Sequence, residues 1–321
     1  MKIGLIDLDY NGKFPNIPLM KLSAYHKLKG DQVYWYSPFY FYDIVYVAKV
    51  FSFTEDWKEP IKADKVIRGG SGYNIRSKNG IEYWSESDTY MQRLPEEVEH
   101  TYPDYELYPT LTKDTAFGFL SRGCPRGCSF CHVAAKEGKK SQKVADLSEF
   151  WKGQNMIVLC DPNLLACKDW KPLIQSLIDS GAYIDINQGL DARMITREKA
   201  EMLTQLKIWK IHFAWDRYQD GEKILPRLKI FREEWEKRKK WRENNNVVYT
   251  LVNFDTTKEQ DLERIYKLRE LGYWAYVMTY DKEHCTDQFY KDLARWVNNR
   301  FIFSVCKTFE EYIKYKNKKV K

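Results

Sequence analysis

Apolar runs alternate with amphipathic stretches along the first third of the chain. Residues 2–9, KIGLIDLD, form an apolar run that ends in acidic residues, as expected for a buried parallel strand. Residues 18–30 begin with proline, carry apolar side chains at helical spacing and stop at Gly30, which predicts a helix. Further strands are expected at 32–37, 43–53 and 63–70. Because strands separated by crossovers pair in parallel, the pattern predicts a small doubly wound, Rossmann-like domain over residues 1–108.

Two segments of this region have no clear periodic pattern. Residues 69–74, GGSGYN, do not match G-x-G-x-x-G, and we expect a turn there rather than a loop that binds a phosphate-bearing ligand. Residues 80–110 are polar and interrupted by proline, which indicates a connector between domains.

The alternation restarts near residue 114 and continues for about half of the chain. Helical stretches separate the expected strands; Thr196 is a candidate N-cap at 196–206, and Thr257 with Gln260 forms a capping box at 257–272. A complete barrel of this type has eight units. We therefore expect a partial (β/α)6, TIM-like barrel over residues 109–285. Its strands are expected at 115–122, 156–161, 182–188, 208–216, 247–255 and 274–281.

Basic residues gather in the last third of the sequence. The apolar spacing at 222–245 predicts a helix, and its run KRKK at 237–240 is expected to be a solvated face rather than a nucleic-acid surface. Residues 286–321 are expected to form a helical extension, with a frayed basic end at 312–321.

Composition indicates an ordinary globular protein. The chain has 321 residues, of which 44% are hydrophobic and 30% charged, and its net charge is +7. No apolar run reaches the roughly 18 residues of a membrane span, and the first residues lack the pattern of a signal peptide. We therefore expect a cytoplasmic protein that does not enter a membrane. Seven cysteines, an odd number, favour thiols or metal ligands over a disulfide framework.

Three cysteines lie within eight residues, in the order C-x3-C-x2-C. Cys124, Cys128 and Cys131 follow the first strand of the expected barrel, and ligand sites in such sheets lie at the carboxyl ends of strands. Thiolates are ligands for zinc, Cu(I) and iron–sulfur clusters. Zinc normally takes four protein ligands, or three and a water molecule. Three cysteines in one loop suit a [4Fe–4S] cluster with one iron left open.

This loop resembles the signature of radical S-adenosylmethionine (SAM) enzymes, in which an aromatic residue, here Phe130, precedes the last cysteine. The resemblance covers residues of about 112–282. It implies that Cys124, Cys128 and Cys131 hold a [4Fe–4S] cluster and that the open iron binds SAM. It also implies reductive cleavage to a 5′-deoxyadenosyl radical, abstraction of hydrogen from a substrate, and an external electron donor such as flavodoxin or ferredoxin.

Polar residues at the other strand ends are candidates for contacts with SAM, whose ammonium, carboxylate and ribose need acids, amides and an arginine. Asp161 stands in CDPN, where the family has a glycine- and acid-containing motif, so only the acid is matched. The other candidates are Gln188, Arg193 and Asp216, each of which could instead be a cap or surface residue.

A doubly wound domain ahead of such a barrel resembles the cobalamin-binding branch of the family. The D-x-H-x-x-G element that supplies an axial histidine is absent, which weighs against cobalamin, although some members bind it without that ligand.

Several alternatives stay open at this point. One is a zinc-stabilised nucleic-acid-binding protein in which His132 joins the three cysteines. Another is a non-catalytic scaffold protein whose barrel no longer binds SAM, which the departure from the family motif at CDPN suggests. Among enzymes, the substrate is expected to be a small molecule or peptide, with an RNA-modifying methyltransferase as the alternative. A methylthiotransferase would carry a second cysteine triad, and the sequence has none.

Overall fold

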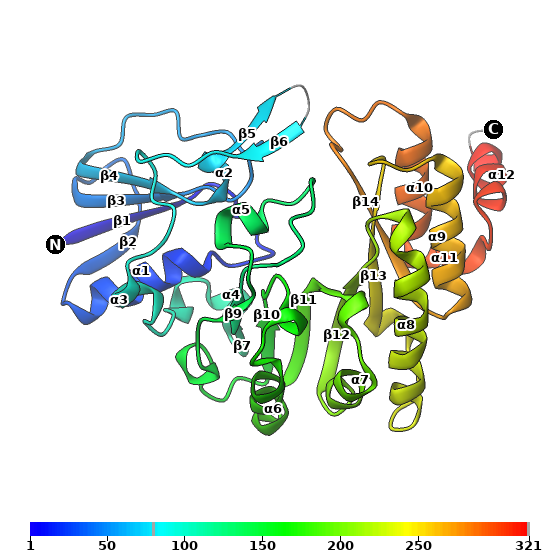
Figure 1. The fold of residues 1–321 in the computed structure, drawn as a ribbon. Helices are drawn as coiled ribbons and strands as arrows, with labels where there is room; N and C mark the ends of the chain where they lie inside the picture. The colour runs from blue at the N-terminus through cyan, green and yellow to red at the C-terminus, as the bar shows by residue number, and fades with distance from the viewer. Residues whose placement is uncertain (79–80, 320–321) are drawn as a thin grey trace. The chain divides into compact units, whose positions relative to one another are not determined.

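The computed structural model describes residues 1–78 and 81–319, and they form an α/β protein with two parallel sheets (Figure 1). The chain divides into two compact units, Met1–Val158 and Leu159–Lys321. Each unit is described by itself below.

The first sheet lies in the amino-terminal unit and has the order β2-β1-β3-β4, with all pairs parallel. Helix α1 (Ile17–Leu28) connects β1 to β2 and begins at Asn16, whose side chain accepts a hydrogen bond from the Leu19 N–H. This sheet confirms the parallel strands that the apolar runs predicted. Its strands are β1 (Lys2–Asp7), β2 (Gln32–Trp35), β3 (Tyr42–Ala48) and β4 (Ala63–Gly69).

The segment after this sheet is more ordered than the sequence suggested. Within GGSGYN, residues Ser71–Asn74 form a single helical turn, α2, and Gly70 before it has a φ of 107°. The expectation that this segment is a turn and does not bind a ligand stays a prediction with respect to the ligand. A hairpin of β5 (Ile75–Lys78) and β6 (Ile81–Trp84) begins before the expected connector and places β6 inside it, while residues 79–80 lie outside the described part. The short helices that follow are α3 (Glu96–Glu99) and α4 (Pro109–Thr112).

The second sheet has the order β14-β13-β12-β11-β10-β7 and is parallel. It contains all six strands that the second series of apolar runs predicted. Strands β7 and β14 are its edges, and no pairing between described residues closes it into a barrel. The strands are β7 (Thr115–Gly118), β10 (Met156–Leu159), β11 (Tyr183–Asp191), β12 (Lys207–Ala214), β13 (Asn246–Val252) and β14 (Trp274–Thr279).

The crossover helices follow the expected caps. Thr196 caps α7 (Arg197–Leu203), and Thr257 with Gln260 forms the capping box of α9 (Lys258–Glu270), as predicted. Helix α9 packs on β13 and β14 (Figure 1). The helix expected at 222–245 was too long, because α8 (Gly221–Glu236) ends before the basic run. The remaining crossover helix is α6 (Trp170–Ser180).

Side chains of the carboxyl-terminal unit's strands divide between two faces of the sheet. Phe213 is buried against Phe231 of α8, with ring centroids 5.0 Å apart, and its pairing partner Val248 is also buried. Because successive side chains point to opposite faces, His212 and Tyr249 lie on the other face. We call this second side of β11–β14 the open face; its exposed members include Tyr276 and Met278.

The carboxyl-terminal residues are helical and packed. Helices α10 (Gln288–Asn298), α11 (Arg300–Val305) and α12 (Phe309–Lys319) follow β14. Tyr312 is 2% exposed and Lys316 Nζ lies 2.6 Å from Asp292 Oδ1. The prediction of a frayed end was therefore wrong for residues 312–319, because apolar side chains and the ion pair with Asp292 hold α12 against the rest of the unit. Residues 320–321 are not described.

None of the helices in the described part of the chain combines the length and the apolar character that a bilayer-spanning helix needs.

Candidate functional site

The cysteine loop lies between β8 (Ser121–Arg122) and α5 (Val133–Glu137) in the amino-terminal unit. Gly123 and Gly127 have φ values of 87° and 57°, a region that residues with a Cβ rarely adopt. A Cβ at Gly123 would also collide with the Lys140 carbonyl. The backbone therefore turns sharply on both sides of Cys124, which leaves the three cysteines in one short, non-regular segment.

Ionic contacts brace the base of this loop. The Arg122 guanidinium lies 3.4 Å from Glu99 Oε1 and 3.5 Å from Glu137 Oε1, and it stacks over the Phe119 ring. The Gly123 N–H donates to Glu137 Oε2, and the Cys124 N–H donates to the Gly138 carbonyl. These contacts fix where the loop leaves β8 and where it returns to the chain.

The three thiols differ in exposure. Cys124 and Cys128 are half-buried, whereas Cys131 is exposed. Half-buried Phe130 lies in the turn that the Cys131 N–H closes by donating to the Cys128 carbonyl. Burial lowers the pKa of nearby Lys136, whose amino group lies 3.7 Å from Glu137.

The chemistry of the loop suits a soft metal or an iron–sulfur cluster, because it offers three thiols within eight residues. In residues 1–78 and 81–319, no group of three or more His, Cys, Asp or Glu side chains is arranged to hold a metal ion. His132, the fourth ligand of the zinc alternative, lies 3.3 Å from Glu82 Oε2 of the β5–β6 hairpin.

The amino-terminal sheet has its topological switch point between β1 and β3, where such folds bind ligands. The Asp9 carboxylate accepts hydrogen bonds there from the Val50 N–H and the Thr54 hydroxyl. The loops after these two strands are therefore tied together across the switch point. Deeper in, the Tyr108 hydroxyl donates to Asp7 Oδ2 at 2.6 Å, and burial raises the pKa of Asp7.

In the carboxyl-terminal unit, the residues that follow β10 are deeply buried. Asp161 is 1% exposed and Asn163 is buried as well, at the start of a short 3₁₀ helix, Leu164–Ala166. Asp161 therefore lies directly after the strand end where the sequence placed it. Its burial shows that Asp161 is not an exposed surface residue.

Gln188 and Arg193 have different surroundings from those expected. Strand β11 runs to Asp191, so exposed Gln188 lies within the strand rather than at its end. Arg193 lies beyond that end, where Nε donates to Asp191 Oδ1 at 2.7 Å and Nη1 donates to Asp220 Oδ2 at 2.5 Å. Two carboxylates of its own chain thus hold the Arg193 guanidinium.

Asp216 follows β12 as predicted. Burial raises its pKa to about 6, against the opposing effect of the buried Arg264 guanidinium. Arg264 of α9 donates to the Trp215 and Asp216 carbonyls at 2.7 and 2.9 Å, and to the Leu251 carbonyl at 2.6 Å. This arginine therefore ties together the carboxyl ends of β12 and β13, and Asp216 sits at that junction.

A polar cluster on the open face was missed by the sequence analysis. It consists of Asp185, His212 and Tyr249, on three neighbouring strands. His212 Nδ1 donates to the Ile186 carbonyl at 2.7 Å, and the Tyr249 hydroxyl donates to the Asn187 carbonyl at 3.0 Å. Burial lowers the pKa of His212 and raises that of Asp185 to about 6. No local motif marks these residues, because they meet only through strand pairing.

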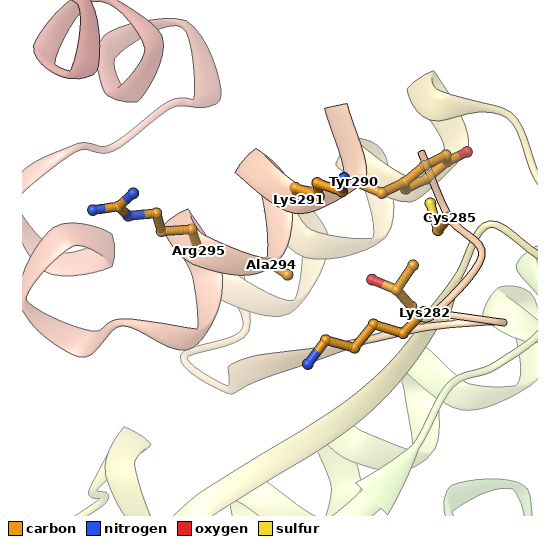
Figure 2. A pocket seen from close by; sticks show the side chains of 7 residues that line it. Lys282, Cys285, Tyr290, Lys291, Ala294 and Arg295 are labelled. Atoms are coloured by element: carbon orange, nitrogen blue, oxygen red, sulfur yellow. The ribbon is translucent and has the colours of Figure 1, made fainter. Parts of the chain in front are cut away.

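A hollow of about 340 Å³ lies after β14 in the same unit. Figure 2 shows Lys282 and Cys285 on the loop and Lys291, Ala294 and Arg295 on α10 around it. Its lining is completed by Thr279 and Tyr290. Three cationic side chains give this hollow a positive charge.

The basic run at 237–240 is largely engaged within its own unit. Lys237 and Arg238 lie within ion-pair distance of Glu234 and Glu201, and Lys239 Nζ donates to the Leu206 carbonyl. Such pairing reduces the charge that the run could offer to a phosphate backbone.

Comparisons with known proteins give no relative for this chain: no protein-family model matches it, and no curated protein does.

Proposed function

We propose that this protein is a radical SAM enzyme whose [4Fe–4S] cluster is held by Cys124, Cys128 and Cys131. The observation that carries the proposal is the C-x3-C-x2-C spacing in a loop that follows the short strand β8, which itself comes two residues after β7, the edge strand of a six-stranded parallel sheet with helical crossovers. We take the two sheets as a partial (β/α)6, TIM-like barrel and a Rossmann-like domain. Bound cluster and SAM would together supply a 5′-deoxyadenosyl radical that removes hydrogen from the substrate.

The chain's own residues have three tasks in this proposal. Gly123 and Gly127 allow the sharp turns of the loop that carries the three thiols, and Arg122 braces the base of that loop. Asp161, after β10, is assigned to the ammonium group of SAM. An external electron donor of the flavodoxin or ferredoxin kind is part of the proposal, as the resemblance implies.

Two further candidates have narrower roles than the resemblance implied. Asp216 keeps a role in binding the ribose or amine, because its carboxyl is held at a strand end and is not ion-paired by a described residue within 4 Å. The Arg193 guanidinium is assigned to holding Asp191 and Asp220. Cobalamin is not included, because Asp9 bridges the switch-point loops and the histidine motif is absent.

The test is anaerobic reconstitution with iron and sulfide, followed by addition of dithionite and SAM and chromatography for 5′-deoxyadenosine. Wild type should turn brown and form deoxyadenosine. A Cys124/Cys128/Cys131→Ala variant should stay colourless and inactive. The matched control is Cys160/Cys167/Cys306→Ala, because these cysteines are buried in the carboxyl-terminal unit and outside the motif; it should keep its cluster if it folds.

Two outcomes would contradict the proposal. A colourless wild type that binds one zinc would favour the zinc-stabilised alternative. A brown protein that leaves SAM intact, with and without candidate substrates, would favour a scaffold that has lost the reaction.

A further inference from the structure

The ladder between β11 and β12 is irregular at two places, between Ile184 and Asp185 and, over a longer stretch, between Ile186 and Leu190. Ile186 pairs with Ile211 and Leu190 pairs with Phe213, so three residues of β11, Asn187–Gly189, stand opposite the single residue His212. Such bulges are over-represented beside active sites, where they redirect side chains and carbonyls. Gly189 fits because a Cβ there would lie 3.2 Å from the Tyr249 ring.

Two side chains hold this bulge in place. His212 donates from Nδ1 to the Ile186 carbonyl, and the Tyr249 hydroxyl donates to the Asn187 carbonyl. The two rings are stacked, with centroids 4.8 Å apart and planes 8° apart. Because a carbonyl only accepts, His212 carries its proton on Nδ1, and in the neutral ring Nε2 has the lone pair.

Asp185 lies at the edge of this arrangement with incomplete hydrogen bonding. Its Oδ1 is enclosed, and no described residue donates a hydrogen bond to it. The nearest cationic or imidazole nitrogen within ion-pair distance is His212 Nδ1 at 3.8 Å, whose proton is already directed to the Ile186 carbonyl. The Asp185 side chain as a whole is 18% exposed.

An enclosed carboxyl oxygen without a donor is unusual, since such atoms are normally satisfied by protein, water or ligand. We propose that Asp185 binds a basic nitrogen of the molecule that occupies the open face, with carboxyl and nitrogen exchanging a proton and with His212 and Tyr249 as positioning residues. In that step the carboxyl O–H bond breaks as the N–H bond forms. The products are a carboxylate and a cationic nitrogen, and no electron is transferred between molecules.

The charges around Asp185 agree with this role. Burial raises its pKa to about 6, and Lys210, its pairing partner on β12, opposes that rise without coming within ion-pair distance among the described contacts. His212 is neutral near pH 7, and Tyr249 has a raised pKa, so neither adds a charge. Tyr183 lies two residues before Asp185 in β11 and therefore on the same face of the strand. A carboxyl in this setting changes protonation near neutral pH, as acid–base groups do.

The inference rests on the proposed function in that the occupant is taken to be its substrate, a small molecule with an amine or ring nitrogen. Its test does not need the cluster. Cluster-free protein with ¹³C-labelled aspartate and histidine is titrated with imidazole, a nitrogen base similar to a histidine side chain, and separately with acetate. Carboxyl signals of Asp185 and ring signals of His212 are followed by NMR from pH 5 to pH 8.

We expect millimolar imidazole to shift both signals, and acetate to leave them unchanged. Asp185→Asn should weaken the imidazole effect on His212 at least tenfold. Asp179→Asn, the same chemical change on exposed Asp179 of α6, should not alter it.

The proposal is overturned if imidazole moves neither signal, if acetate acts equally, or if Asp185→Asn binds imidazole as wild type does. If Asp185→Asn does not fold, the comparison of imidazole with acetate in wild type still decides. Failure of deoxyadenosine formation in the reconstituted protein would contradict the proposed function alone, because the NMR titration is made without iron or SAM.

Discussion

The His212 imidazole lies flat against the Tyr249 ring, with centroids 4.8 Å apart and planes 8° apart. Both side chains also donate hydrogen bonds to carbonyls of the neighbouring strand β11. The stacked pair thus joins three strands of the carboxyl-terminal unit through their side chains as well as through the ladder.

His212→Phe should preserve the stack and remove the hydrogen bond to the Ile186 carbonyl. Because this carbonyl then lacks its side-chain donor, we expect the free energy of unfolding to fall by about 1 to 3 kcal/mol. Urea denaturation measures the change. Tyr249→Phe removes the other donor, and the double variant should lose less than the sum of the two, since both act on one bulge. Full additivity would show that the two hydrogen bonds act separately.

Arg264→Met should be among the more destabilising single changes in this unit. It leaves the buried Asp261 carboxylate without its cation and three strand-end carbonyls without a donor, at a cost of about 3 to 5 kcal/mol. Chemical denaturation again gives the value. Adding Asp261→Asn should restore part of the loss. Exposed Arg227→Met on α8 is the matched control and should change stability by less than about 0.5 kcal/mol.

Asp185 and Asp216 should make the protein less stable as the pH rises from about 4 to about 6. Both folded-state pKa values are raised to about 6, whereas unfolded aspartate titrates near 3.9. In that window the folded state binds more protons than the unfolded state, so the free energy of unfolding falls with increasing pH. The expected effect is on the order of 1 kcal/mol for each carboxyl.

This pH effect is measured by urea denaturation of wild type at pH 4.5, 5.5 and 6.5. Asp185→Asn and Asp216→Asn should each reduce the difference between these stabilities, and Asp179→Asn should not. A variant slope equal to that of wild type would show that the carboxyl titrates at its ordinary pKa.

Tyr312→Ala should destabilise the carboxyl-terminal unit by about 3 to 5 kcal/mol, because a buried aromatic side chain is removed. Its ring lies 6.0 Å from that of Phe309, which in turn packs on Trp296 of α10. Thermal unfolding and hydrogen exchange of α10 report the loss. Tyr315→Ala, on an exposed position of the same helix, is the control. Equal small effects of the two changes would mean that α12 is dispensable.

Local chemistry explains why much of the fold was predictable. Thr196 and Thr257 mark the first residues of helices, because each side chain accepts a hydrogen bond from the N–H three positions later. Such a cap depends only on neighbouring residues, so it can be recognised in the sequence. Apolar runs marked every strand of the six-stranded sheet, because strands that crossover helices cover are buried and therefore rich in apolar side chains. The cysteine loop was found from spacing, which is also a local property.

Non-local pairing explains what was missed. Asp185 and His212 come together only through the register of β11 and β12. The three-residue bulge that places Gln188 inside the strand cannot be recognised from the alternation of apolar and polar residues. Likewise, the basic end of the chain resembled a frayed tail because its partner for Lys316, Asp292, lies on another helix.

The bulge at Asn187–Gly189 has a consequence for chain length. Between its two flanking pairs, β11 advances by four residues while β12 advances by two. Because the difference is even, Ile186 and Leu190 still point to the same buried side, and a shortened strand lacking two residues would keep the same inward and outward pattern. Deleting two residues of the bulge as a unit would therefore remove part of the backbone on the open face without reversing which side chains of β11 face the core.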